Sequence, residues 1–272
     1  MMAGGQIIDP DAVAFLTAAG ITDATISSAI NILVLDLKSY GIWTKMKAIY
    51  PFVGGFASTH KFNLKNPQDT NAAFRLTFLG GWTHSANGAQ PNGTNAYANT
   101  FLTPSANQSL TSGHFSLYSR TLAASIAGAG TNGSSGVRDN ASPTRASYIT
   151  VRSSSNASQT VMWGDGLGNE TPVVTSTDAR GFYISTRTAA NSLIFLRNNS
   201  VVSSATSNQT ITVLSSFSYF LSGINYSGSP LNNGYDNKEL AFASIGDGLN
   251  NTEAADFYTA VQAFQTTLGR QV

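Results

Sequence analysis

The feature that most constrains the fold is a change of hydrophobic period near residue 61. From there on, apolar and polar residues tend to alternate in short runs, as in half-buried β-strands; Phe74, Leu76 and Phe78, for example, are separated by single polar residues. Further strands are predicted at His114–Thr121, Ser147–Ser153, Gln159–Trp163, Gly181–Thr186, Ser192–Arg197, Val201–Ala205, Gln209–Leu214, Phe217–Ile224 and Glu239–Ile245. Such a series of short strands predicts an antiparallel two-sheet β-sandwich or jelly roll.

The connections between these runs carry turn signals. Asn198-Asn199-Ser200 separates two of the predicted strands, and asparagine tolerates positive φ, so a tight hairpin is expected there. The segment Ala123–Pro143 is rich in Gly, Ser, Asn and Ala and has no period. It is interpreted as a long exposed loop, because strand patterns continue in the same style on both sides.

Helical patterns occupy the two ends of the chain. Asp9 before Pro10 predicts a helix start and Gly20 its end. A second helix is predicted from about Thr22 to Gly41, and a closing helix from about Thr252. The closing helix is expected to bury the stripe Phe257, Val261, Phe264 and Leu268. We therefore divide the chain into residues 1–55, a helical attachment or packing segment, and 56–272, the sandwich with its closing helix.

Composition excludes several classes of function. The chain has 272 residues, of which 42% are hydrophobic and 11% charged, with a net charge of +1. That balance argues against nucleic acid as a partner, which requires a clustered positive excess. No cysteine is present, so disulfides and thiolate metal sites are excluded. No membrane-length apolar run and no signal peptide are visible.

Motifs for catalysis or cofactor binding are weak. Gly128–Gly133 matches a dinucleotide-binding pattern but lacks the following helix and acidic residue, so we interpret it as a loop and expect no cofactor. His60, His84 and His114 have no metal-ligand spacing, and no metal site is expected. A Ser-His-Asp site assembled in space is left open, because such triads ignore chain order.

Carboxylates give the sharper test of enzymatic function. Glycosidases need two acids at a set separation, whereas glutamate occurs here only at Glu170, Glu239 and Glu253. No predicted strand carries two acids on one face, so no catalytic residue is assigned. Asp165 with Glu170, and Asp236 with Glu239, are better explained by turn formation, with calcium or sugar contact as the alternative.

Aromatic residues provide candidates for glycan contact. Trp43, Trp82 and Trp163 could each stack on a sugar or fill the core, and core packing is favoured even for Trp163. Because Trp163 adjoins a Gly-Asp-Gly loop, it is still the best candidate for exposure. The predicted glycan-contact residues are therefore Trp163, Asp165 and Asn169.

Several segments resemble proteins of tailed phages. Ser28–Gly55, with His60–Lys65, Ala73–Phe78 and Asn92–Tyr97 after it, is similar to a module of phage virion and tail-associated proteins. Glu239–Leu249 and Phe257–Arg270 resemble the last strand and closing helix of their concanavalin A-like (laminin G-like) domains. These proteins belong to phages of gut bacteria, including crAss-like phages.

The resemblance implies a lectin-like sandwich displayed on a virion, in a fibre, tail or capsid surface. We expect a non-enzymatic virion structural protein with a glycan- or receptor-binding role, and a virion-associated polysaccharide depolymerase is the alternative. The expected partners are other virion proteins, further copies of the chain and a host-surface glycan, with no nucleic acid and no membrane.

Overall fold

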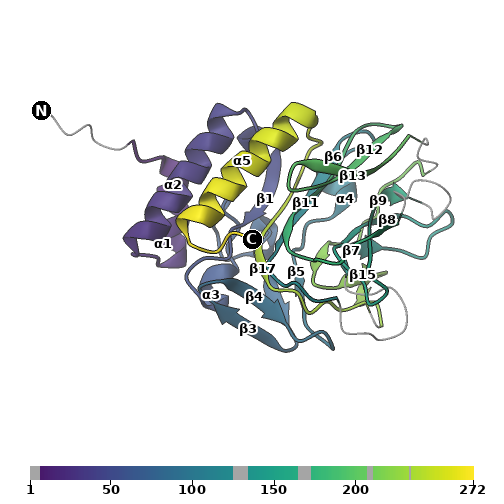
Figure 1. The fold of residues 1–272 in the computed structure, drawn as a ribbon, viewed down its shortest axis with the longest axis horizontal. Helices are drawn as coiled ribbons and strands as arrows, with labels where there is room; N and C mark the ends of the chain where they lie inside the picture. The colour runs from purple at the N-terminus through teal and green to yellow at the C-terminus, as the bar shows by residue number, and fades with distance from the viewer. Residues whose placement is uncertain (1–6, 125–133, 165–172, 207–210, 233) are drawn as a thin grey trace, which may run out of the picture.

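The computed structural model describes residues 7–124, 134–164, 173–206, 211–232 and 234–272 (Figure 1). The helices are α1 (Pro10–Ala19), α2 (Ala24–Ser39), α3 (Ala57–His60), α4 (Pro104–Asn107) and α5 (Asn251–Thr267), with 3-10 turns at Trp43–Lys45 and Asn71–Ala73. The strands are β1 (Met46–Tyr50), β2 (Thr77–Leu79), β3 (Trp82–Ser85), β4 (Gly88–Pro91), β5 (Tyr97–Asn99), β6 (Gly113–Ser119), β7 (Ser134–Arg138), β8 (Ala146–Thr150), β9 (Ala157–Gly164), β10 (Val174–Thr175), β11 (Gly181–Ala189), β12 (Ser192–Arg197), β13 (Ser200–Ala205), β14 (Phe220–Leu221), β15 (Ile224–Tyr226), β16 (Ser229–Pro230) and β17 (Leu240–Gly246).

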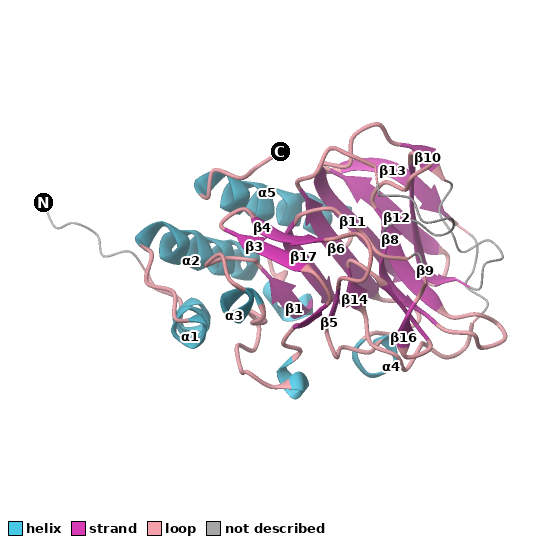
Figure 2. Cartoon of the chain, turned by 90° about the horizontal axis from the view of Figure 1, so that it is seen from below, coloured by secondary structure: helices cyan, strands magenta, loops and turns pink. Residues whose placement is uncertain are grey.

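The described strands form two sheets that face each other (Figure 2). One has the order β13-β12-β11-β6-β17-β4-β3, with β1 also paired to β17; it is called the helix-covered sheet below. The other has the order β10-β9-β8-β7-β14-β5-β2, with β15 and β16 attached. Pairing is antiparallel except between β15 and β7. The chain is thus a jelly-roll β-sandwich, as the sequence predicts.

The space between the sheets holds one hydrophobic layer. Phe115 and Leu117 of β6 point into it, together with Tyr183 of β11 and Ile245 of β17. Leu76 is buried there, and Phe74 and Phe78 are partly buried against the same layer. Alternation of side chains along each strand sends these residues to one face of the sheet.

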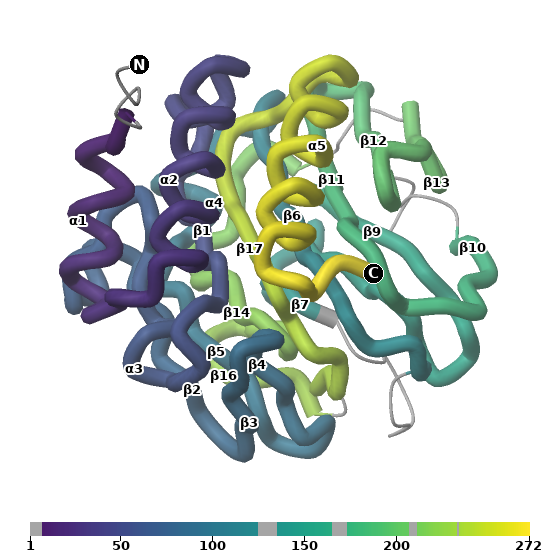
Figure 3. The backbone as a smooth tube through the Cα atoms, turned by 60° about the vertical axis from the view of Figure 1, so that its left-hand side comes forward, coloured from purple at the N-terminus to yellow at the C-terminus, as the bar shows by residue number. Residues whose placement is uncertain are grey.

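A second hydrophobic layer lies on the outer face of the helix-covered sheet. Tyr118, Phe182 and Phe242 point outward from β6, β11 and β17 and meet Phe257 and Phe264 of α5. Figures 1 and 3 show α1, α2 and α5 side by side over this face. The helices pack on the sheet because isolated helices of this length are marginal in water.

The expected stripe of the closing helix is largely confirmed. Phe257, Val261 and Phe264 are at most 2% exposed, whereas Leu268 is only partly buried. Asn250 caps the helix through a capping box with Glu253.

Arg270, which follows α5, bonds the carboxyl-terminal end of the chain to the sheet. Arg270 donates hydrogen bonds to the carbonyl oxygens of Pro51 (2.6 Å), Phe52 (2.8 Å) and Ala241 (3.0 Å). Its guanidinium is buried, and this burial lowers the pKa of Arg270 to about 9. These bonds join the carboxyl-terminal end of the chain to segments that are distant in sequence.

The amino-terminal helices share the outer layer with α5. Asp9 accepts from the Asp11 N–H, and Gly20 adopts positive φ at the end of α1, as expected from the sequence. Phe15 of α1 is fully buried in the outer layer. Met46–Tyr50, within the predicted helical segment, is a strand of the helix-covered sheet and pairs with β17. The attachment role expected for residues 1–55 stays a prediction.

The predicted strands that correspond to β6, β8, β9, β11, β12, β13 and β17 are confirmed, and several details elsewhere are wrong. The hairpin at Asn198-Asn199 joins β12 and β13, with φ of 48° and 63°. Phe74 has a φ of 59° and precedes its strand rather than forming part of it. Phe217–Ile224 contains two short strands in place of one, and residues 211–214 form no strand, while 207–210 lie outside the described residues.

The loop predicted at Ala123–Pro143 contains a strand of the second sheet. Ser134–Arg138 forms β7, which pairs with β8, β14 and β15. Its only large apolar residue is Val137, so no alternating pattern marks it in the sequence. A Cβ at Gly136 would collide with the Ser147 carbonyl of β8, which explains a glycine there. Within the described residues, no helix has the length and apolar character that crossing a membrane requires.

Replacement of Phe264 by alanine tests the outer layer. The Phe264 ring is 2% exposed and packs against Phe242 of β17. Phe264→Ala should therefore lower the free energy of unfolding by about 3 to 5 kcal/mol. Thr266→Ala, at an exposed position of the same helix, should change it by less than about 0.5 kcal/mol. Chemical denaturation measures both, and equal effects of the two substitutions would contradict the assigned packing.

Candidate functional site

A surface hollow beside the β3–β4 hairpin combines an aromatic ring with uncharged polar groups. Its volume is about 440 Å³. The residues that line it are Gly81, Trp82, Thr83, Gln90, Pro91, Asn92 and Asn237. We call it the Trp82 hollow. Indole, amide and hydroxyl groups around a shallow cavity can recognise a small polar ligand that also has apolar faces.

Trp82 is fixed at the edge of the sandwich. Its indole Nε1–H donates to the carbonyl oxygens of Leu79 (3.0 Å) and Tyr97 (3.3 Å). The Phe78 ring packs edge-on against it at 5.2 Å, and the His84 ring lies nearly parallel to it at 6.1 Å. Trp82 is half-buried, so these contacts orient the ring and leave part of it exposed.

Two turns hold the walls of the hollow. A Cβ at Gly80 would collide with the Asn95 backbone, and its φ of 75° suits glycine. Asn92 Oδ1 accepts from the backbone N–H groups of Thr94 (2.9 Å), Asn95 (3.1 Å) and Ala96 (3.2 Å). This side-chain-to-backbone network preorganises the turn that follows β4.

The polar groups of the hollow are neutral. Gln90 Nε2 donates to the Asn237 carbonyl oxygen at 3.1 Å, and both Gln90 and Thr83 are exposed. Among the described residues, Asn237 Oδ1 accepts no hydrogen bond. No lining residue carries a formal charge. The hollow therefore favours an uncharged ligand with several hydroxyl or amide groups.

Trp163, the one predicted glycan-contact residue that the structure describes, does not line the Trp82 hollow. Trp163 is 1% exposed and packs in the layer between the sheets, with its ring against Gly113 and the Arg187 guanidinium 5.8 Å from the ring centre. The structure thus favours the core alternative for this tryptophan, because a buried ring offers no face to a sugar. Asp165 and Asn169 lie outside the described residues.

Trp82 is one of the three tryptophan candidates, but it is not among the predicted glycan-contact residues. Trp43, the third tryptophan, is 8% exposed and has the Lys65 ammonium 4.0 Å from its ring centre, so it belongs to the outer layer. The signal for Trp82 was its place between two turn sequences, Gly80-Gly81 before it and Asn92–Asn95 after the hairpin. Short edge strands between turns expose side chains more than central strands do.

A histidine pair, His60 and His84, lies next to the ring of Trp82: the His84 ring contacts the rings of Phe78, Trp82 and His60. His60 Nε2 accepts from the Gly55 N–H at 3.2 Å, so its proton resides on Nδ1, which donates to His84 Nδ1 at 2.9 Å. Burial, together with the charges of His84 and Arg270, lowers the pKa of His60 to about 3. Both rings are therefore neutral near pH 7, in keeping with the uncharged hollow beside them.

A serine–histidine pair does exist, but it is structural. His114 Nδ1 is 2.7 Å from the Asp247 carbonyl oxygen and must donate to it, so Nε2 accepts from Ser244 Oγ at 2.9 Å. Ser116 Oγ lies 2.7 Å from Ser244 Oγ and completes the chain. All three side chains are fully buried, and the Phe257 ring covers His114. No substrate can reach this serine in the folded protein.

The two described carboxylates that were considered for metal or sugar contact are ion-paired. Asp236 binds Lys238 at 2.7 Å in a buried pair, and Glu239 binds Arg120 at 2.7 Å. Within the described part of the chain, no group of three or more His, Asp or Glu residues is placed to hold a metal ion. Glu170 lies outside the described residues, as Asp165 does.

Comparison with solved structures identifies similar folds at very low sequence identity. A mutant of Trypanosoma rangeli sialidase displaying trans-sialidase activity matches with a TM-score of 0.54 and 8% identity, over 85% of this chain and 38% of that one. The structure of HCR/D-Sa-GBL1/C matches with a TM-score of 0.50 and 8% identity, over 81% and 53%. Domain 4 of AbnA, a GH43 extracellular arabinanase from Geobacillus stearothermophilus, in complex with arabinotriose, has a TM-score of 0.42 and 12% identity, over 78% and 98%.

These likenesses show the β-sandwich fold alone, and this chain spans about 38% and 53% of the first two proteins. No protein-family model and no curated protein sequence matches the chain.

The buried histidines predict a dependence of stability on acid. Burial lowers the pKa of His60 to about 3 and that of His114 to about 4, while both should titrate near 6.5 when unfolded. Below pH 6.5, His60 and His114 therefore bind protons in the unfolded chain but remain neutral in the folded chain. As pH drops from 6.5 towards 5, the free energy of unfolding should fall with a slope that rises towards about 1.4 kcal/mol per pH unit for each histidine.

Denaturation titrations across this range measure that slope. His114→Gln and His60→Gln should each reduce it, because each removes one group that titrates only after unfolding. A wild-type stability that stays constant between pH 6.5 and 5, where most carboxylates remain ionised in both states, would contradict the assignment.

Proposed function

We propose that the protein is a non-catalytic, lectin-like module that binds an uncharged glycan in the Trp82 hollow. The observation that carries the proposal is that the half-buried Trp82 lines one hollow together with the exposed residues Thr83 and Gln90. A sugar ring presents apolar C–H faces to an aromatic ring and hydroxyl groups to amides. The hollow supplies both an aromatic surface and amide groups. No flexible Lys or Arg side chain has to be immobilised when the glycan binds.

The neutrality of the hollow supports a glycan without acidic groups. Recognition of a carboxylate or phosphate relies on Arg, Lys or a helix amino terminus, and the lining contains none of the cationic residues. An uncharged lining would leave an acidic sugar desolvated without a partner. We therefore expect hexoses and N-acetylhexosamines to bind in preference to uronic or sialic acids.

The ion pairs of the carboxylates support a binding function over hydrolysis. Glycoside cleavage needs one acid with a raised pKa and a second carboxylate a few ångströms away. Hydrogen bonds from Lys61 and Arg180 instead lower the pKa values of Asp69 and Asp178. Burial raises the pKa of Asp36, but this residue lies on α2, away from the hollow. A polysaccharide depolymerase remains the second candidate.

We further propose that the module belongs to a phage particle, as a fibre, tail or capsid-surface component. The support is the resemblance of Ser28–Gly55 and Phe257–Arg270 to phage virion proteins. In that setting the hollow would contact a host-surface glycan while other virion proteins and further copies of the chain hold the module. Localisation of the chain in intact particles by imaging tests this part.

Glycan-array binding with variants of the hollow tests the proposed site. Trp82→Ala should abolish binding, and Gln90→Ala should weaken it by roughly 5- to 30-fold, which corresponds to about 1 to 2 kcal/mol for a lost hydrogen bond. Gln68→Ala, at an exposed glutamine outside the hollow, is the matched control and should bind like wild type. Glycan binding that survives Trp82→Ala and Gln90→Ala would place the site elsewhere.

Incubation with host polysaccharides separates binding from cleavage. We expect binding without release of reducing ends, because the described carboxylates lack the arrangement that hydrolysis needs. The control variants are Asp165→Asn and Glu170→Gln. Chain shortening by wild type that disappears in either variant would replace the binding function by the depolymerase.

A further inference from the structure

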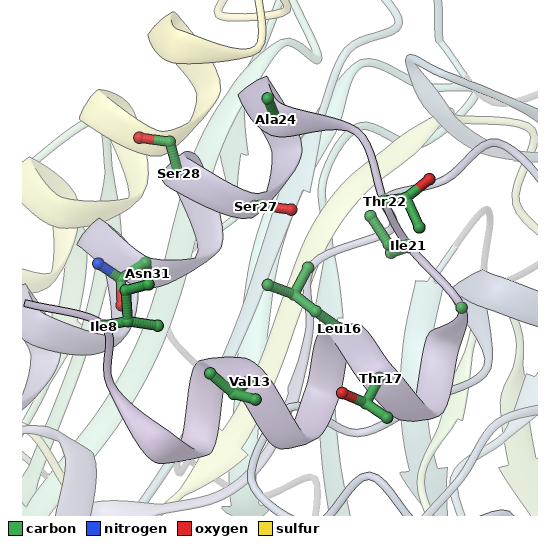
Figure 4. A pocket seen from close by; sticks show the side chains of 11 residues that line it. Ile8, Val13, Leu16, Thr17, Ile21, Thr22, Ala24, Ser27, Ser28 and Asn31 are labelled. Carbon is green, nitrogen blue, oxygen red and sulfur yellow. The ribbon is translucent and has the colours of Figure 1, made fainter. Parts of the chain in front are cut away.

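An apolar groove separates α1 from α2 on the surface of the helical layer. Its volume is about 580 Å³. The lining residues include Leu16 and Thr17 of α1, Ile21 of the connecting turn and Ser27 and Ser28 of α2, and all lining residues are uncharged. Figure 4 shows side chains of both helices around this space. The groove lies between α1 and α2, whereas the Trp82 hollow lies at the β3–β4 hairpin.

Exposed apolar side chains stand beside the groove. Ile7 is 75% exposed, Ile8 66% and Val13 46%, and Ile8 and Val13 also form part of the groove wall. Single exposed apolar residues are ordinary on protein surfaces, whereas several next to an apolar hollow mark an interaction surface. We call Ile7, Ile8, Val13 and the groove the α1 surface.

The backbone that carries the two isoleucines is held in place. Asn31, which is 4% exposed, accepts from the Asp9 N–H at 2.7 Å and donates to the Ile7 carbonyl oxygen at 2.9 Å. Both carboxylate oxygens of Asp9 bind Lys38 Nζ, at 2.7 and 2.8 Å. The isoleucines therefore project from a fixed segment, and little ordering entropy is lost when they are covered.

We propose that the α1 surface pairs with the α1 surface of a second copy of this chain. Ile7 and Ile8 project from the same face on which the groove opens. Around a two-fold axis, the isoleucines of each copy can therefore enter the groove of the other copy. The uncharged lining avoids repulsion between identical surfaces. Anionic lipid is a poorer occupant, because it requires free Lys or Arg, and Lys38 is occupied by Asp9 and by Asp11 at 2.6 Å.

The exposed side of α1 enlarges the contact. Specific interfaces bury about 1,200 to 2,000 Å² in total, more than the groove alone provides. Ala14, Thr17 and Ala18 are exposed on α1, and such small uncharged residues let a second helix approach closely. Two α1 helices packed across the axis would add this area to the contacts of Ile7 and Ile8.

Sedimentation of the full chain over a concentration series tests the pairing. Wild type should form a dimer, and the double variant Ile7→Glu with Ile8→Glu should sediment as a monomer with an unchanged circular dichroism spectrum. Val201→Glu, at a 58% exposed valine of β13, is the matched control and should remain dimeric. A monomeric wild type up to millimolar concentration, or a dimer that persists in the double variant, would overturn the proposal.

Engineered cysteines locate the contact directly, because the natural chain has none. Under mild oxidation, at least one of Ala14→Cys and Thr17→Cys should form a covalent dimer, and Val201→Cys should not. A crosslink at Val201→Cys alone would assign self-association to the β13 edge and overturn the proposed surface. Glycan binding by the monomeric double variant is measured separately, so either hypothesis can fail without the other.

Discussion

The structure depends on burial of the helix-covered sheet on both of its faces. Phe115 and Leu117 of β6 are buried in the layer between the sheets, while Tyr118 of the same strand is buried in the layer under the helices. Polar residues on the outer face are tolerated because they bond to one another, as His114 and Ser244 do. Removal of the helices would therefore expose one hydrophobic layer and a buried polar network together.

The doubly buried sheet also decides where binding can occur. Its central strands β6, β11 and β17 are covered on both sides and offer no surface to a ligand. Exposure returns at the β3–β4 end, beyond the reach of the helices (Figure 3), and there the Trp82 hollow opens. The α1 surface lies on the helical layer, so glycan binding and self-association can use separate faces of one rigid unit.

Sequence patterns predicted elements better than they predicted exposure. The helix start at Asp9 and the hairpin at Asn198 are local signals, and they appear where expected. The burial of Trp163 depends on which strands stack across it, and a local pattern does not contain that information. The strand β7 was missed for a related reason: its small residues are buried by neighbours distant in sequence.

The indole proton resonances of the three tryptophans test the central claim directly. The chain contains three tryptophans, and in the structure Trp43 and Trp163 are buried while Trp82 reaches the surface. On titration with a neutral oligosaccharide that the protein binds, the Trp82 indole signal should shift progressively and the other two should remain in place. A saturable titration that leaves the Trp82 signal unmoved would contradict the assignment of the hollow as the glycan site.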